Sequence, residues 1–316
     1  MIVLLAGCLI ALGGCSQPPA KEMPVIRYVN FKVYDPVYVA IDKGFCEKQG
    51  IKCKIIGDVL GGPTAIQAVA SGSCEAGLSS IPALINANAA GLPVQGVVDV
   101  QTTLPGQALQ RWFVLEDSPI QVLEDVPGHV YAVNLWRSSF HYTSLLAMSQ
   151  RGIDEDSVTW TLLSFSNQIP ALMEGEIDVA GFIQPYQNYL LMEYGDQVRE
   201  LFNDYDDVYG TRHVSLIFVN RVWAQSNPET AEAFVTAIAD AIDWIEDNQE
   251  EARGIIAKYT GIPTEAVPEY HFTEHGRVRV QDVAAWMHYL RGRGDLTADW
   301  LEPGAVATDE YNARIR

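Results

Sequence analysis

The feature that most constrains the fold of this 316-residue chain is a repeat of its turn residues at a fixed spacing. Three residues recur 103 positions later in the same order: Gly72, Glu75 and Pro82 return as Gly175, Asp178 and Pro185. The same shift places Asp35 on Ser138 and Thr64 on Asn167, which are residue types that begin helices. Two lobes of like topology are the simplest account of this repeat, whether it reflects common ancestry or coincidence among similar βα units.

Strand-like segments alternate with helix-like segments along both halves, a pattern typical of parallel α/β units. In the first half we expect strands at 25–31, 51–55, 76–78 and 94–100. The first helix is predicted to begin at Asp35-Pro36 and to end at Gly50. Towards the C-terminus, helices are expected at 228–245, 249–259 and 281–291. Strands 109–115 and 214–220 are predicted to be hinges between a lobe of residues 23–110 plus 218–316 and a lobe of residues 111–217.

The N-terminus is predicted to be a lipoprotein signal and tether, residues 1–22. Its apolar run is shorter than the roughly 20 residues of a spanning helix and ends in Leu12-Gly13-Gly14-Cys15. Cys15 is therefore the predicted lipidation site, in preference to Cys8, which almost no hydrophobic region precedes. No Lys or Arg precedes Cys15, which departs from an ordinary signal, and a disordered apolar N-terminus is the alternative.

Composition favours a folded protein and argues against nucleic acid as a partner. Hydrophobic residues make up 48% of the chain, and the remaining roughly 300 residues suit two lobes. Acidic residues outnumber basic ones by 40 to 21, giving a formal charge of −19, and no cluster of Lys or Arg interrupts this excess. The acidic residues are spread widely, so we interpret them as a solubilising surface.

Three cysteines follow the signal, and a bridge between Cys46 and Cys53 is a hypothesis from their closeness to a predicted helix end and strand start. Cys74 would then be a free thiol. The segment from His271 to His275 matches the letters of a zinc-peptidase helix, but Pro268 and Gly276 leave no room for a long helix. We predict no metal and no cofactor.

Three stretches together resemble a known family: Tyr38-Val-Ala-Ile-Asp-Lys-Gly-Phe-Cys-Glu-Lys-Gln-Gly-Ile51, Gly61-Gly-Pro-Thr-Ala-Ile-Gln-Ala-Val-Ala-Ser-Gly72 and Ala171-Leu-Met-Glu-Gly-Glu-Ile-Asp-Val-Ala180. They are similar to the nitrate, sulfonate and taurine class of ABC-importer binding proteins, which includes binders of thiamin pyrimidine precursors. The resemblance implies a type II periplasmic-binding fold whose two lobes close on a small solute. It also implies delivery to a membrane permease driven by a separate cytoplasmic ATPase. No phosphate-binding loop motif occurs in this chain.

As a member of that family the chain is expected to be a monomer in the periplasm or at the outer face of the cell membrane, held there only by its lipid. It is not expected to be an enzyme. A pyrimidine-precursor synthase of the same fold is the enzymatic alternative, although that enzyme's cysteine-rich signature is absent. A ligand sensor that presents its closed form to a partner protein is a third possibility with the same sequence features.

Open α/β sheets bind solutes at the carboxyl ends of their strands, where helix N-termini point N–H groups inward. The repeat therefore nominates six strand-to-helix junctions as the binding site. In the first lobe the candidates are Tyr34, Asp35, Gly62, Pro63, Thr64, Ser79 and Ser80, and in the second they are Trp136, Arg137, Ser138, Ser139, His141, Asn167, Gln184 and Tyr186.

These candidates support two kinds of solute. Arg137 and the helix N-termini favour a sulfonate, carboxylate or similar anion. Asp35, together with the aromatic residues Tyr34, Trp136 and Tyr186, favours an amine-bearing heteroaromatic such as a pyrimidine. We favour the anion. Ordinary helix capping by the Ser, Asn and Asp residues, and ordinary packing of the aromatic ones, are the competing explanations.

Overall fold

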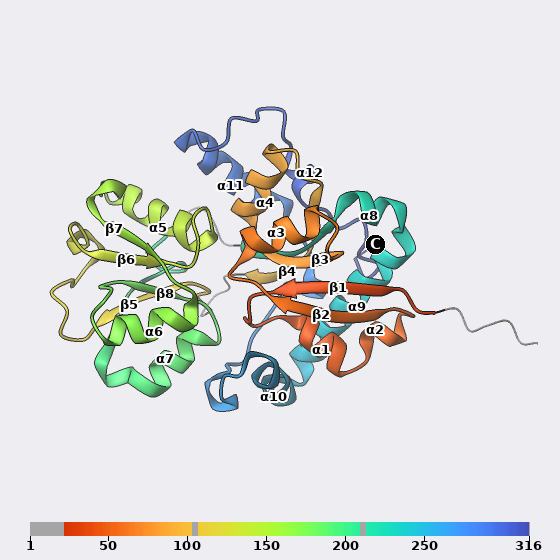
Figure 1. Ribbon diagram of the computed structural model, residues 1–316, viewed down its shortest axis with the longest axis horizontal. Coiled ribbons are helices and arrows are strands. Elements are labelled where there is room, and N and C mark those ends of the chain that lie inside the picture. Colours follow the sequence, from red (N-terminus) through yellow and green to blue (C-terminus); the bar gives the residue numbers. More distant parts are fainter. Residues whose placement is uncertain (1–21, 103–106, 209–212, 316) are drawn as a thin grey trace, which may run out of the picture.

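The chain folds into two α/β lobes that lie side by side (Figure 1), described by a computed structural model for residues 22–102, 107–208 and 213–315. The first lobe contains a five-stranded sheet of order β2-β1-β3-β10-β4, in which β10 is antiparallel to its neighbours β3 and β4. Its strands are β1 (Val25–Asn30), β2 (Lys52–Asp58), β3 (Ala76–Ser80), β4 (Val94–Thr102) and β10 (His213–Asn220). The predicted α/β fold of two lobes is confirmed.

The second lobe repeats this strand order. Strand β5 lies antiparallel between β8 and β9, β6 pairs with β7 in parallel, and a bridge from Tyr131 to Val179 joins the two groups. The strands are β5 (Arg111–Leu115), β6 (Val130–Val133), β7 (Thr159–Leu162), β8 (Ala180–Phe182) and β9 (Val198–Asn203). Read from β7 to β9, the order matches that of the first lobe from β2 to β4.

The repeat seen in the sequence is also a repeat of hydrogen bonds. The carboxylate of Glu75 accepts from the backbone N–H of Arg27 at 2.8 Å, and that of Asp178 accepts from Val130 at 2.7 Å. Donor and acceptor are both displaced by the same 103 positions. Helices α3 (Gly62–Ala70) and α6 (Phe165–Met173) keep this shift at both ends. The two lobes therefore share one local design.

The remaining helices cover the two sheets and form the C-terminal part of the first lobe. They are α1 (Pro36–Asp42), α2 (Phe45–Lys48), α4 (Ile81–Ala89), α5 (Ser139–Gln150), α7 (Tyr186–Tyr194), α8 (Arg221–Ser226), α9 (Pro228–Asp247), α10 (Gln249–Thr260), α11 (Val280–Arg293) and α12 (Pro303–Val306). Short 3-10 turns are η1 (Leu123–Asp125), η2 (Glu155–Ser157), η3 (Gly195–Gln197), η4 (Thr264–Ala266) and η5 (Glu274–Gly276). Helices α10 and α11 lie on opposite sides of the junction between the lobes (Figure 1).

The first predicted helix is wrong in its length. It is broken into α1 and α2 at Gly44, whose φ of 70° lies in the left-handed region. Because glycine adopts this conformation at no steric cost, the chain turns there instead of continuing to Gly50. Helix α9, by contrast, begins at the predicted proline and buries one apolar face that includes Phe234 and Ile238.

The predicted hinge strands exist, but they do not cross between the lobes. Strand β5 pairs within the second lobe, and β10 pairs within the first over its whole length. The chain crosses just before each of them, between Thr102 and Arg111 and between Asn203 and His213. A boundary at 217/218 would cut β10, so we propose that residues 23–102 and 213–316 form the first lobe. Residues 103–106 and 209–212 within the crossings lie outside the described residues.

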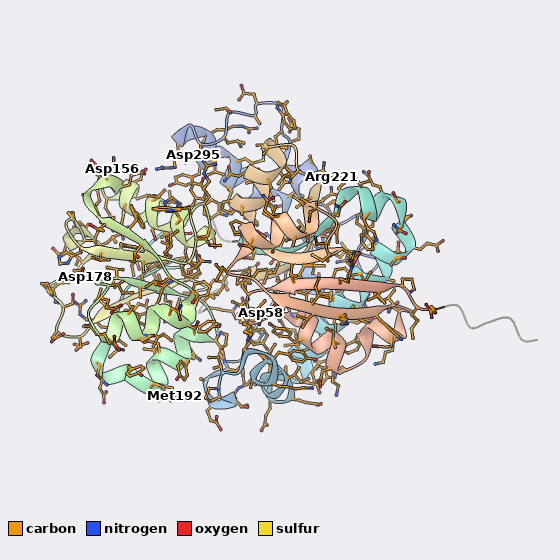
Figure 2. The ribbon with its side chains drawn as sticks, in the orientation of Figure 1. Asp58, Asp156, Asp178, Met192, Arg221 and Asp295 are labelled. Atoms are coloured by element: carbon orange, nitrogen blue, oxygen red, sulfur yellow. A yellow bond between two sulfur atoms is a disulfide. The ribbon has the colours of Figure 1, made fainter. Side chains whose placement is uncertain are left out.

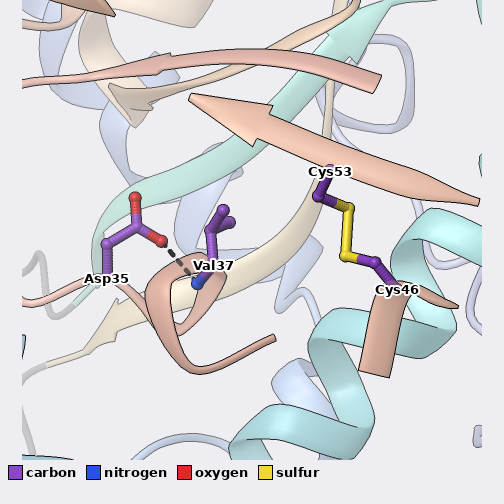
Figure 3. The surroundings of a disulfide bond; sticks show 4 residues. All are labelled: Asp35, Val37, Cys46 and Cys53. Carbon is purple, nitrogen blue, oxygen red and sulfur yellow. Dashed lines mark hydrogen bonds between the residues drawn. A yellow bond between two sulfur atoms is a disulfide. The ribbon is translucent and has the colours of Figure 1, made fainter. Parts of the chain in front are cut away.

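The predicted disulfide is confirmed. Cys46 in α2 bridges to Cys53 in β2 with their Cα atoms 5.9 Å apart (Figure 3), and Cys74 is buried outside the bridge. The bridge fastens the short α2 to the edge strand of the sheet. Cys15 and most of the predicted signal lie outside the described residues. Within the described part, no helix has the length and apolar character needed to span a bilayer.

Candidate functional site

Two helix N-termini meet at the end of β3, around Ser79. Helix α3 begins at Gly62 and α4 begins directly after Ser80, and no side chain hydrogen-bonds to cap either helix. Gly62 is packed so closely on this strand that a Cβ there would lie 2.3 Å from the Ser79 Oγ. That Oγ is fully buried and has no hydrogen-bond partner among the described residues. Such a pair of N-termini with an unpartnered hydroxyl between them favours a bound anion.

Ser80 points to the other face of the sheet, because side chains alternate along a strand. Ser215 on β10 pairs with Ser80 on one side and with Gln101 of β4 on the other. The three side chains therefore lie in one row about 10 Å long across the end of the sheet. The Ser80 hydroxyl and both amide atoms of Gln101 are buried without a hydrogen-bond partner in the described residues. Gln101 was not predicted, because only strand pairing places it beside Ser80.

Tyr34 lies where the two lobes touch. Its ring stacks on that of Tyr270 with centroids 4.5 Å apart, and its backbone N–H donates to the carbonyl oxygen of Gln184 in the second lobe at 3.3 Å. Both tyrosine hydroxyls and the Gln184 Oε1 are buried and unpartnered within the described part of the chain. Burial raises the pKa of both phenols. These groups offer uncharged donors and one acceptor to a solute. No pattern in the sequence indicated Tyr270 as a site residue.

Asp35, which is predicted for the site, has structural partners within the first lobe. Its carboxylate is fully buried and accepts from the backbone N–H of Val37 (Figure 3), the Tyr28 hydroxyl and the Asn30 amide. It therefore caps α1 and ties it to β1. Burial raises the pKa of Asp35, while the same three hydrogen bonds oppose that shift. Three of the roughly four acceptor positions of this carboxylate are thus used within the first lobe.

The second lobe reaches this region through the loop that joins β6 to α5. A Cβ on Gly61 would lie 2.9 Å from Leu135 Cδ1 and 3.1 Å from the Asn134 Nδ2. Asn134 is buried, and its Oδ1 accepts from the Ser138 hydroxyl at 2.8 Å. The amide N–H of Asn134 thus lies beside the start of α3, which packs on Ser79. Asn134 was not predicted. Its equivalent in the first lobe, 103 positions earlier, is Phe31, which has no amide side chain.

Arg137 lies at the rim of the junction. It is exposed and has a left-handed φ of 60°. Together with Trp136 it lines a shallow cavity of about 220 Å³, whose other wall is formed by α3 and α4 of the first lobe. Pro63 lines the same cavity, whereas the neighbouring Thr64 is exposed. No acid pairs with Arg137 among the described residues. Its guanidinium is therefore available to a solute or to solvent at the rim.

Three predicted residues of α5 have partners inside the second lobe. Ser138 caps the helix by accepting from the His141 N–H, and Ser139 accepts from the side chain of Gln110. His141 accepts from the Arg137 N–H and packs edge-on against Trp136, and burial lowers its pKa to about 4. His141 is therefore neutral near pH 7. These residues shape the wall of the second lobe and offer little free hydrogen-bonding capacity.

The last two predicted junctions border a larger cavity between the lobes. This cavity of about 500 Å³ separates α6 and α7 from residues 261–263 that follow α10, and Tyr186 contributes to its wall. Asn167 is exposed in the first turn of α6, because the helix begins at Phe165 and its N-cap is Ser164. The charge of Asp58 in the first lobe adds to the burial that raises the pKa of Tyr186, and Figure 2 shows Asp58 where β2 faces the second lobe.

The segment from His271 to His275 does not form a metal site. His271 pairs with Glu246 and His275 with Asp243, both on α9. Residues 274–276 form a 3-10 turn in which His275 has a left-handed φ of 55°. In the described parts of the chain, no group of three or more His, Cys, Asp or Glu is arranged to hold a metal ion.

Comparison with known proteins places this architecture in a family. The NMT1/THI5-like family model matches residues 32–252, which is more than half of the chain. The chain belongs to the NMT1/THI5-like family. It is 26% identical over 209 residues to a putative aliphatic sulfonates-binding protein of Escherichia coli K12. That match covers 66% of this chain and 63% of the relative, so the chain spans less than two thirds of this curated relative's length.

Solved structures of similar fold include a binding protein and an enzyme. The alkanesulfonate-binding protein of Xanthomonas axonopodis pv. citri, bound to MOPS, superimposes with a TM-score of 0.75 over 92% of this chain and all of its own, at 18% identity. The desulfurization enzyme DszB gives a TM-score of 0.65 over 92% of this chain and 96% of its own, at 17% identity. The same fold thus occurs in a binding protein and in an enzyme, so the fold alone does not decide between the two.

Proposed function

We propose that this chain is the solute-binding component of an ABC importer and holds a small anion of the sulfonate class between its lobes. The observation that carries this proposal is the buried, unpartnered Ser79 hydroxyl between the N-termini of α3 and α4. Uncharged N–H and O–H donors bind such anions without a buried cation, because the helix N-termini supply partial positive charge. Arg137 at the rim adds a charge that attracts an anion to the site.

A thermal-shift screen followed by calorimetry tests this function. The panel contains taurine, alkanesulfonates, nitrate, aromatic carboxylates and aminopyrimidines, and a solute at 100 times its Kd should add about 2.7 kcal/mol of stability. For a sulfonate that binds, we expect Ser79→Ala to weaken binding at least tenfold. Ser71→Ala, an exposed serine at the far end of α3, is the matched control and should leave the affinity unchanged. Equal affinity of the two variants would refute the proposed anion site.

A small amine-bearing heteroaromatic is the second candidate solute. Tyr34 and Tyr270 present a stacked pair of rings with unpartnered hydroxyls. The charges of Asp99 and Asp204 add to the burial that raises the pKa of Tyr270, so carboxylates lie near that hydroxyl. If an aminopyrimidine stabilises the protein while every sulfonate fails, and Tyr270→Phe removes that effect, this candidate replaces the anion.

We also propose that the chain binds its solute without transforming it. The free thiol in the described residues, Cys74, precedes β3, whereas Ser79 and Ser80 lie at the opposite end of that strand. Burial raises the pKa of Cys74 to about 11, which keeps it a thiol near neutral pH. We expect each bound solute to be recovered unchanged, as measured by mass spectrometry. Any product that forms only with active protein would make the chain an enzyme.

The proposed location is the periplasm or the outer face of the cell membrane, with Cys15 carrying the lipid. The proposed partners are a membrane permease and its separate ATPase, with the chain itself a monomer. Cys15→Ser should move the protein from the membrane fraction to the soluble fraction. Crosslinking in cells separates an importer from a sensor, because an importer should be captured with a permease. Capture with a signalling receptor alone would instead support a sensor.

A further inference from the structure

An ion pair joins the two lobes on the side of α11. Arg293 at the end of α11 contacts Glu155 of η2 in the second lobe through both guanidinium nitrogens, at 2.8 Å and 3.1 Å. Figure 2 marks the two sides of this contact by Asp295, which follows α11, and Asp156, which follows Glu155. One hydrogen bond and one ion-pair contact, made by the two terminal nitrogens of the guanidinium, define the relative position of the two groups more strictly than a single contact would.

Both partners of this pair are held in place by their own lobes. The Nε of Arg293 lies 2.9 Å from the Asp295 carboxylate, and its guanidinium lies 5.9 Å from the centre of the Tyr289 ring. The backbone carbonyl of Glu155 accepts from the Trp160 indole at 2.9 Å. The Arg293 side chain is only 22% exposed. Because these groups are positioned in advance, the pair forms with little further loss of side-chain freedom.

The ion pair lies beside other contacts between the lobes. Tyr142 and Leu145 of α5 pack into the apolar cluster that contains Leu290 of α11, and the Asn86 amide of α4 donates to the Tyr142 hydroxyl at 3.2 Å. On the opposite side, α7 and residues 261–263 are separated by the 500 Å³ cavity. The first lobe is thus attached to the second on the α11 side, whereas on the α10 side a cavity lies between them although η4 and α7 approach each other there.

We propose that Glu155 and Arg293 form a latch that stabilises the closed arrangement of the lobes. The proposal builds on the proposed binding of a solute between the lobes, and it takes the lobes to open on the α11 side, where opening separates these two residues. A latch of this kind makes closure sensitive to salt and lowers the rate at which a bound solute leaves. Neither residue contacts the Ser79 region, so the latch acts on the lobes and not on the solute.

Pulsed electron resonance between spin labels at Glu176→Cys and Glu229→Cys tests the latch without any solute. These exposed positions report the separation of the lobes. Glu155→Gln should raise the ratio of open to closed protein up to about fivefold at low salt. Its effect should vanish near 1 M salt, where the Debye length falls to about 3 Å. Arg293→Gln should do the same, and the double variant should be no more open than either single one.

The matched control is Asp156→Asn, which removes an exposed charge next to Glu155 that makes no ion pair among the described residues. It should leave the label distances as in the unmodified chain. Identical distances in Glu155→Gln and the unmodified chain at low salt would overturn the latch, even if a solute binds as proposed. A latch that behaves as expected in a protein that binds no solute of the panel would instead overturn the proposed function alone.

Discussion

Replacing Asp35 by alanine decides whether this residue serves the fold or the solute. Loss of the N-cap costs about 1 kcal/mol. The Tyr28 hydroxyl and one N–H of Asn30 then become buried donors without their acceptor, at about 1–3 kcal/mol each. We therefore expect Asp35→Ala to lower the free energy of unfolding by about 4 kcal/mol.

Urea unfolding monitored by circular dichroism measures this loss, with Ser138→Ala as the control at the equivalent position of the second lobe. Ser138 accepts one bond, from His141 at 3.3 Å, and donates one to the buried Asn134 Oδ1 at 2.8 Å, so its replacement should cost about 2–3 kcal/mol, less than the loss expected for Asp35→Ala. An Asp35→Ala variant that is as stable as Ser138→Ala, but no longer binds solute, would refute the reasoning. In that case Asp35 would be a binding residue, as the sequence predicted.

The pH dependence of stability gives a second test of the same residue. Burial raises the pKa of Asp35 in the folded protein above its value in the unfolded chain. The folded state therefore binds this proton more tightly, and the resulting stabilisation is present at acid pH and is lost as the pH rises through the folded pKa. The stability of the unmodified chain relative to Asp35→Asn should increase as the pH falls from 7 towards 4. A difference that does not change with pH would show that the pKa is not raised.

Three further predictions concern other parts of the molecule. Removing the Cys46–Cys53 bridge in a double serine variant should cost about 2–3 kcal/mol, because the bridge closes a loop of sequence separation 7, and reductant should then have no additional effect. Gly62→Ala should cost about 1–3 kcal/mol in thermal unfolding, since its Cβ has no space, whereas Gly254→Ala in an open part of α10 should be neutral or stabilising; equal effects would contradict the packing argument. The His141 ring should titrate near pH 4 by NMR, and a midpoint near 6.5 would show that burial does not act on it.

Local patterns in the sequence were sufficient to predict much of the fold. The repeat at 103 positions predicted two lobes of like topology, and Pro228 predicted where α9 begins. The helix that was predicted to run to Gly50 failed because Gly44 adopts a left-handed conformation that its neighbours do not indicate. The hinges were misplaced because a strand's own sequence does not show which sheet it joins.

The candidate site was only partly predictable, because its members are defined by what surrounds them. Tyr34, Ser79 and Gln184 were predicted from their junctions, and the two hydroxyls and the Gln184 Oε1 are buried without a partner in the described residues. Gln101 and Tyr270 share this property but come from segments without any junction signal. Whether a serine or aspartate caps a helix or faces a solute depends on neighbours that are distant in the chain.

The sequence alone determined the features of this protein that depend on local residue patterns. These are the duplicated βα units, the helix starts and the pair of cysteines close enough to bridge. These features depend on φ/ψ preferences and on side chains a few residues apart, so the residue types at neighbouring positions indicate them. The tertiary structure alone decided that Asp35 also bonds to Tyr28 and Asn30, that Asn134 faces α3, and that Glu155 meets Arg293 from the other lobe. Such contacts join groups brought together only by closure of the chain, and the free energy of burying or pairing them depends on that long-range geometry.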